Sequence, residues 1–320
     1  MTADTKTPSL AHGTLVDPRV LMAIRNLEFR ARVVVEGFWN GLHRSPYHGF
    51  SVEFTEYRAY TPGDDPRYLD WRLFARSDRY YIKKFQDETN LRCHLLVDNS
   101  RSMGYGSLPY TKSQYANTLA ATLAYFLSLQ GDAIGLLSFD AQIREYLPAR
   151  NRPGHLRHLM LALEQPAGGS ETDLGAPLKR IAEMVRKRGL MVLISDLLAS
   201  LDNLEQNLAA LSACGHEILL FQVLDPAELA FSFTEAGLYL DAESGRDFYL
   251  EPAIARRGYL RKLNDHLAAV QRVCRDLGAG YCQVSTDRPL ELALFDFLRA
   301  RMQRRHKNKR SRFHSSRSAP

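Results

Sequence analysis

Residues 93–102 read CHLLVDNSRS, a stretch that changes from apolar to polar at Asp98. Its first half, Cys93–Val97, is a short apolar run, which predicts a buried β-strand. The chain then becomes polar, with a carboxylate at Asp98 and hydroxyls at Ser100 and Ser102. Helical spacing of apolar residues follows over residues 112–129. A buried strand that leads through a polar tip into an amphipathic helix indicates an α/β sheet.

The same alternation continues toward the C-terminus. Short apolar runs predict further buried strands over residues 133–139, 190–194, 217–223 and 281–284. Helical spacing predicts helices over residues 156–163, 174–188, 201–213, 260–277 and 289–302, with Gly189 and Gly278 as C-terminal caps. Strands that alternate with helices are typical of an α/β fold with a doubly wound, mostly parallel sheet and right-handed crossovers. Residues 227–251 interrupt this alternation of strands and helices and predict an inserted β-hairpin.

The N-terminal part of the chain is expected to be an extension that packs on this domain. Residues 1–18 are mostly polar and are expected to be disordered, whereas residues 19–90 form the extension. Apolar spacing predicts one amphipathic helix over residues 20–35 that stops near Gly37. Short strand-like pieces lie at residues 51–54 and 80–85.

The net charge of +6 comes from the C-terminal tail of this 320-residue chain. Residues 301–320 contain eight Lys or Arg and no acid, so the rest has 42 − 8 = 34 basic against 36 acidic residues, a net charge of −2. The body is therefore not a basic nucleic-acid binder, and attraction to phosphate would have to come from the tail. Residues 303–320 are expected to be disordered.

Composition and cysteine spacing indicate a globular protein in a reducing compartment. Hydrophobic residues make up 45% and charged residues 24% of the chain, which are ordinary globular values. The four cysteines are widely spread and form no C-x-x-C pair, which favours free thiols in a reducing compartment. No run approaches the roughly 18 apolar residues of a membrane helix, and the start lacks a signal-peptide pattern. We expect a cytoplasmic protein without a membrane span.

Oxygen-bearing side chains gather at the predicted strand ends. Asp98, Ser100 and Ser102 follow the first strand, Thr172 lies in a loop before a helix, and Asp196 follows the strand over 190–194. Each taken alone also fits helix capping. Together they offer oxygen donors and no soft ligand, which suits a hard divalent cation, Mg²⁺ above all, with Mn²⁺ or Ca²⁺ as alternatives.

These residues resemble a known site. Asp98-x-Ser100-x-Ser102, a separate Thr172 and a later Asp196 are similar to the metal-ion-dependent adhesion site of von Willebrand factor A domains. The resemblance spans about residues 91–298. It implies that the five residues bind a divalent cation whose open position accepts an Asp or Glu of a partner protein. Glu171 beside Thr172 departs from the pattern, because it is an extra carboxylate.

The segment RAYTPGDDPRYLDWR at residues 58–72 carries a second resemblance. It looks like the signature of domain-of-unknown-function family 58, in which it precedes a von Willebrand A-like domain. Genes of that bacterial family often accompany MoxR-type AAA+ ATPases, which implies such an ATPase as partner. Interleaved Arg and Asp also suggest a network of ion pairs that fixes an irregular segment, with partner docking as the alternative. The residues concerned are Arg58, Asp64, Asp65, Arg67, Asp70, Trp71, Arg72 and Arg76.

Three functions are therefore open. The first is a non-enzymatic protein-binding module with a divalent-metal site. The second is a Mg²⁺-dependent phosphoesterase-like hydrolase of the haloacid dehalogenase type, which would need an Asp at position 100, where this chain has Ser100. The third is nucleic-acid binding by the basic tail. Because no catalytic motif of the common kinds is present, we expect the first function and no enzyme activity.

Overall fold

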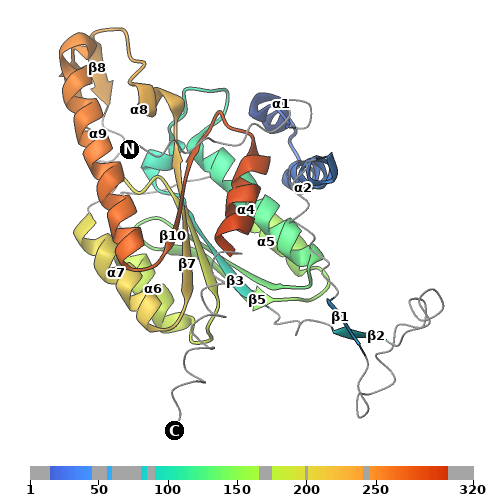
Figure 1. Cartoon of the computed structure of the whole chain (residues 1–320). Coiled ribbons are helices and arrows are strands. Elements are labelled where there is room, and N and C mark those ends of the chain that lie inside the picture. Colours follow the sequence, from blue (N-terminus) through green and yellow to red (C-terminus); the bar gives the residue numbers. More distant parts are fainter. Residues whose placement is uncertain are drawn as a thin grey trace, which may run out of the picture. The chain divides into compact units, whose positions relative to one another are not determined.

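The computed structural model describes residues 15–44, 56–59, 81–84, 91–165, 175–198, 201–240 and 246–301 (Figure 1). Within 41–44, 56–59 and 81–84, as at residues 202 and 203, only the backbone is described. The chain divides into two compact units, of which the larger comprises residues 12–41 and 91–320. In the smaller unit, residues 1–11 and 42–90, β1 (Glu56–Ala59) pairs with β2 (Tyr81–Lys84) in antiparallel fashion. The strand expected at 51–54 lies outside the described residues.

The larger unit contains a six-stranded sheet in the order β10-β7-β6-β3-β4-β5. All neighbouring strands are parallel except β4 and β5, which confirms the predicted doubly wound, mostly parallel sheet. The strands are β3 (Arg92–Asp98), β4 (Ala133–Phe139), β5 (Ile143–Arg150), β6 (Leu190–Ser195), β7 (Glu217–Leu224) and β10 (Gly280–Ser285). Every residue of β6 is buried, as expected for a central strand covered on both faces.

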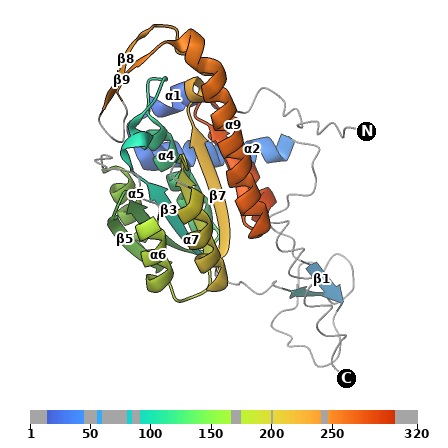
Figure 2. The ribbon, with the colours of Figure 1, turned by 90° about the vertical axis from the view of Figure 1, so that its left-hand side faces the viewer.

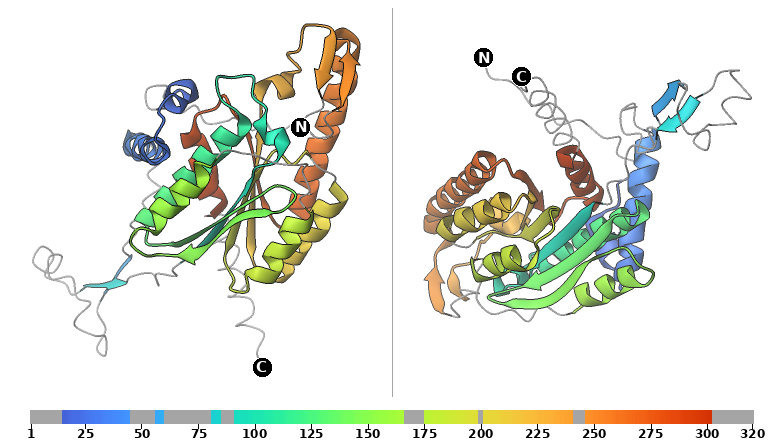
Figure 3. Two further views of the ribbon diagram at one scale, coloured as in Figure 1. Left: turned by 180° about the vertical axis from the view of Figure 1, so that it is seen from behind. Right: turned by 90° about the horizontal axis from the view of Figure 1, so that it is seen from below.

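Helices cover both faces of this sheet (Figures 2 and 3). One face carries α4 (Lys112–Leu129), α5 (His155–Leu163) and a last helix from residue 290 to residue 301. The other carries α6 (Gly175–Met184), α7 (Leu201–Ala213) and α9 (Pro252–Asp276). Leu96, Leu193 and Leu220 of three adjacent strands share a buried apolar cluster with residues of α6, α7 and α9.

The N-terminal helix is broken in two, which corrects the prediction of one helix over 20–35. The chain forms α1 (Pro18–Met22) and α2 (Leu27–Arg44). Asn26 explains the new start, because its Oδ1 accepts a hydrogen bond from the Phe29 N–H at 2.7 Å. The helix also continues past Gly37, because Phe38 remains on the buried face and packs against Phe126 and Phe295 with ring centroids 6.1 and 4.6 Å apart.

Two glycines predicted as caps have different roles. Gly278 follows α9 with φ of +64°, and its N–H donates to the Arg275 carbonyl at 3.1 Å, so the C-terminal cap is confirmed. Gly189 does not cap a helix, because α6 already ends at Met184. A Cβ at Gly189 would lie 2.5 Å from the Arg92 carbonyl oxygen of β3, so glycine is required for close approach of the two backbones.

The predicted hairpin is present beside the start of α9 (Figure 2). After the short helix α8 (Pro226–Ala230), β8 (Gly237–Leu240) pairs with β9 (Asp247–Leu250) in antiparallel fashion. The connecting residues 241–245 lie outside the described part of the chain. Aromatic rings anchor the hairpin, since Tyr239 contacts Phe233 with centroids 5.8 Å apart and Phe231 contacts Tyr259 of α9 at 4.9 Å.

No helix in the described ranges has the length and apolar character that a membrane crossing requires.

Candidate metal site at the sheet edge

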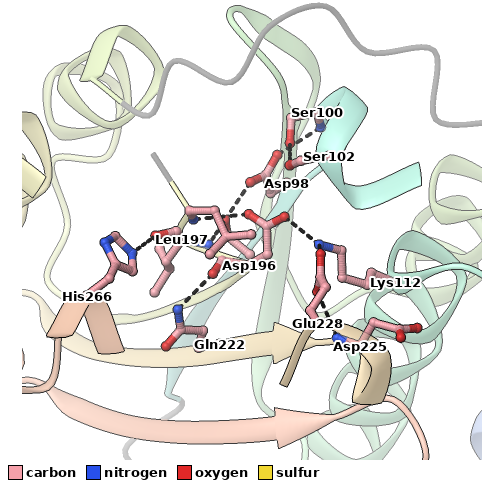
Figure 4. Close-up of polar contacts among 12 residues, drawn as sticks. Asp98, Ser100, Ser102, Lys112, Asp196, Leu197, Gln222, Asp225, Glu228 and His266 are labelled. Carbon is pink, nitrogen blue, oxygen red and sulfur yellow. Dashed lines mark hydrogen bonds and ion pairs between the residues drawn. The ribbon is translucent and has the colours of Figure 1, made fainter. Parts of the chain in front are cut away.

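The candidate site lies where the direction of winding reverses. β3 pairs with β6, and the helices that follow these strands, α4 and α7, cover opposite faces of the sheet. In open α/β sheets, ligands bind at the carboxyl ends of the strands at such a switch point. β3 ends at Asp98, and Asp196 directly follows β6. The topology therefore brings the two predicted carboxylates to one edge (Figure 4).

Asp98 is fully buried and held by hydrogen bonds on both oxygens. Its Oδ1 accepts the Ser100 backbone N–H at 2.8 Å, and its Oδ2 accepts the Ser195 hydroxyl at 2.5 Å. Burial raises the pKa of Asp98 to about 7, and the nearby charge of Asp196 adds to the shift. The hydrogen bonds oppose the shift but do not cancel it. The anionic form of Asp98 is thus costly, and a cation close to its oxygens would favour it.

The two predicted hydroxyls lie next to Asp98. Ser100 is buried, whereas Ser102 is half-buried in the short 3-10 helix η2 (Arg101–Gly104). Their Oγ atoms are 3.2 Å apart. Figure 4 shows both side chains close to the Asp98 carboxylate.

Asp196 is fully buried and ion-paired with a lysine that sequence analysis missed. The Lys112 ammonium of α4 lies 2.9 Å from Asp196 Oδ2 and 2.7 Å from Glu228 Oε1 of α8. Burial lowers the pKa of Lys112, but the two carboxylates outweigh this effect and raise it above its usual range. Lys112 therefore carries a positive charge at neutral pH.

The ion pair continues into a network around α8. Glu228 Oε2 accepts the backbone N–H of Asp225 at 2.9 Å. Asp225, also fully buried, accepts the backbone N–H of Ser107 at 2.8 Å and the Ser107 hydroxyl at 2.5 Å. The DPAE pattern at residues 225–228 is a recognisable capping box, whereas Lys112 at the start of a helix gives no sequence signal of a buried ion pair.

The backbone beside Asp196 is strained. Leu197 has φ of 54°, a left-handed conformation that leucine rarely adopts. It is held by its buried side chain, by its N–H to Ser195 Oγ at 3.0 Å, and by its carbonyl, which accepts from His266 Nε2 at 2.7 Å. Strain of this kind clusters at functional sites, because only a well-determined environment maintains it.

Four of the five predicted ligands are at this edge: Asp98, Ser100, Ser102 and Asp196. Thr172 lies outside the described residues. Of the signature residues, Arg58 belongs to β1, where only the backbone is described, and Asp64, Asp65, Arg67, Asp70, Trp71, Arg72 and Arg76 lie outside the described residues.

The donor set suits a hard cation by its chemistry. Within the described ranges, no group of three or more His, Cys, Asp or Glu side chains could hold a metal ion. A site here would instead combine the two carboxylates with hydroxyl oxygens, the oxygen-only ligation that Mg²⁺ prefers. Asp98, Asp196 and Glu228 with Lys112 carry a formal charge of −3 + 1 = −2 when all are ionised, which a divalent cation would neutralise.

Comparison with known proteins identifies a family and relatives that cover most of the chain. Residues 56–269 match the family described as "Protein of unknown function DUF58". Uncharacterized protein Mb1516 of Mycobacterium bovis and uncharacterized protein Rv1480 of Mycobacterium tuberculosis are each 32% identical over 287 residues, 88% of this chain and 89% of theirs.

Two solved structures show weaker likeness. Conserved hypothetical protein BatB from Bacteroides thetaiotaomicron has a TM-score of 0.46 and 14% identity, covering 66% of this chain and 99% of that one. The VWA domain of SpRpn10 has a TM-score of 0.37 and 13% identity, covering 64% and 93%. Both TM-scores are below 0.5, so the family match is the informative result.

Proposed function

This chain belongs to the protein family of unknown function DUF58, and we propose that it is a non-enzymatic protein-binding module. In this proposal a divalent cation at the sheet edge docks an Asp or Glu side chain of a partner protein. The resemblance of residues 91–298 to von Willebrand factor A domains supports an interaction module. The observation that carries the proposal is the meeting of Asp98 and Asp196 with the hydroxyls of Ser100 and Ser102 at the switch point.

The chemistry of the ligands supports docking of an acidic group. Asp98, Ser100, Ser102 and Asp196 would hold the cation, with Thr172 as the fifth proposed ligand. When bound, the cation supplies an electrophilic coordination position. Neutral hydroxyls in place of further carboxylates leave it able to accept a carboxylate from outside. Mg²⁺ is the proposed ion, and Mn²⁺ or Ca²⁺ are the alternatives for the same oxygen donors.

A MoxR-type AAA+ ATPase is the proposed partner, acting with this chain in the cytoplasm. The compartment is supported by the cysteines, since all four are free thiols, and Cys93 and Cys274 are buried. Position 100 argues against a phosphatase of the haloacid dehalogenase type, because a serine stands where such an enzyme needs its second Asp.

The test is direct binding to the purified MoxR-type ATPase encoded nearest to the gene of this chain. Binding is measured by interferometry in Mg²⁺ and again in EDTA, for wild type and Asp98→Ala. We expect binding in Mg²⁺ that EDTA and Asp98→Ala each weaken by tenfold or more. Asp265→Ala, an exposed acid on α9, is the matched control and should bind like wild type.

Two results would contradict the proposal. Binding that is equal with and without EDTA would exclude metal-dependent docking. Turnover of p-nitrophenyl phosphate in Mg²⁺ that disappears in Asp98→Ala would show that the site is enzymatic.

A further inference from the structure

Lys112 places a cation that belongs to the chain inside the candidate metal site. Its side chain has no exposed surface, and neither has that of Asp196. The ammonium lies 2.9 Å from Asp196 Oδ2 and 2.7 Å from Glu228 Oε1 (Figure 4). It is 5.9 Å from the centroid of the Tyr105 ring. These contacts are short enough for strong, charge-assisted hydrogen bonds. Asp196 thus already has a counter-ion without any metal.

Asp196 would have to serve two cations. Its Oδ2 contacts Lys112, and its Oδ1 accepts the Leu198 N–H at 3.3 Å. A metal that uses Asp196 must either displace Lys112 or share the carboxylate with it. Both alternatives cost free energy, because the two cations repel each other in a buried environment where charge interactions are strong. Asp98 has no such competitor among the contacts described for it, since its oxygens accept only from Ser100 and Ser195.

We propose that Lys112 is a built-in competitor that sets the affinity of this site for divalent cations, with Glu228 as the acceptor that keeps the ammonium when a metal takes Asp196. This inference rests on the proposed function, because it assumes that the sheet edge binds a metal. In the metal-free protein Lys112 bridges both carboxylates. With a metal bound, Asp196 would be a ligand of the metal, and Lys112 would keep its ion pair with Glu228.

The position of Glu228 gives this exchange a structural consequence. Glu228 belongs to α8, and its other carboxylate oxygen accepts the N–H of Asp225, the N-cap of that helix. Asp225 in turn holds Ser107 in the loop before α4. Lys112 is therefore connected through Glu228 and Asp225 to the loop before α4.

The test uses Mn²⁺ as the probe, measured by calorimetric titration and by paramagnetic resonance of free Mn²⁺, on the full chain. Lys112→Met removes the competing charge and should tighten Mn²⁺ binding by about tenfold or more, the usual effect of one nearby like charge. Glu228→Gln removes the negative charge that retains the Lys112 ammonium and should weaken binding. Lys262→Met, an exposed lysine of α9, is the matched control and should leave the affinity unchanged.

A double variant separates competition from simple damage to the fold. If Lys112 and Glu228 act together, Glu228→Gln should weaken Mn²⁺ binding less when Lys112→Met is already present. If Lys112→Met alone fails to fold, Glu228→Gln still tests the inference. Weaker binding in that variant supports the acceptor role, and unchanged binding overturns it.

The outcomes distinguish the two proposals. If wild type binds Mn²⁺ through Asp98 and Lys112→Met binds it equally or more weakly, the role of Lys112 is wrong and the proposed metal site is still supported. Binding by Lys112→Met but not by wild type supports the competitor and contradicts metal-dependent docking by the natural chain. No binding by either protein overturns both.

Discussion

Replacing Asp98 with asparagine should stabilise the metal-free protein at alkaline pH. Burial raises the pKa of Asp98 from 3.8 to about 7. A carboxyl whose pKa is higher in the folded state binds its proton more tightly there than in the unfolded chain. The stability that this proton contributes is fully present below the pKa of the unfolded chain. It is lost as the pH rises through the pKa of the folded protein, so wild type loses stability between pH 4 and pH 7.

The magnitude follows from the shift. Three pKa units at 1.36 kcal/mol each correspond to about 4 kcal/mol over the full range, and to about 2–3 kcal/mol between pH 5 and pH 8. Asp98→Asn cannot ionise, and its amide oxygen can still accept one of the two hydrogen bonds made to Asp98. The free energy of unfolding of Asp98→Asn minus that of wild type should therefore be larger by about 2–3 kcal/mol at pH 8 than at pH 5, so the variant gains stability relative to wild type.

Urea unfolding in EDTA at the two pH values measures this difference. Asp265→Asn, at an exposed position of α9, controls for removal of any carboxylate and should follow wild type. The same difference between Asp98→Asn and wild type at both pH values would refute the argument that burial makes the Asp98 anion costly. A larger advantage of the variant at pH 5 would show that its sign is wrong.

Three stability predictions concern the scaffold, each checked by urea unfolding. Gly189→Ala should destabilise by about 1–3 kcal/mol because its Cβ meets a β3 carbonyl, whereas Gly258→Ala within α9, where the space is open, should be neutral or stabilising by up to about 1 kcal/mol. Phe38→Ala should cost about 3–5 kcal/mol because its buried ring packs on α4, whereas Phe29→Ala on the same helix, 52% exposed, should cost about 0.5 kcal/mol or less. Asp225→Ala should cost about 1–2 kcal/mol, because three hydrogen-bond donors lose their acceptor. The packing described would be contradicted if Gly258→Ala cost as much stability as Gly189→Ala, or if Phe29→Ala cost as much as Phe38→Ala. The hydrogen bonds described for Asp225 would be contradicted if Asp225→Ala cost no stability.

The sequence predicts those strands that are buried on both faces, because each is a continuous apolar run. It does not predict β5, whose residues Ile143–Arg150 are half-buried or exposed along an edge and show neither a long apolar run nor strict alternation. The break between α1 and α2 is missed for a related reason. Apolar spacing continues through Ile24 and Leu27, and only the side-chain hydrogen bond of Asn26 reveals a new helix start.

The candidate site is predictable where it depends on position along one strand. Asp98, Ser100 and Ser102 occupy alternate positions after a recognisable strand, and Asp196 follows another. Lys112 is not predictable, since its partners lie 84 and 116 residues away in the chain. A lysine at the start of a helix normally points to solvent. Only the tertiary fold, which brings α4, β6 and α8 together, gives it two carboxylates and no exposed surface.

Burial at the switch point connects the stability of the fold to the binding proposed for it. The two carboxylates are buried because the parallel strands that carry them are covered on both faces, and the same burial makes an uncompensated charge costly there. Lys112 compensates the negative charge of Asp196, but it is not among the contacts described for Asp98. A divalent cation at Asp98 would remove the remaining cost, and any ligand that binds only the folded state raises the free energy of unfolding by RT ln(1 + [L]/Kd). The metal that docks a partner would then also stabilise the domain. Competition from Lys112 would lower the affinity of the site for the metal, and that affinity would determine how partner binding and the free energy of unfolding depend on the metal concentration.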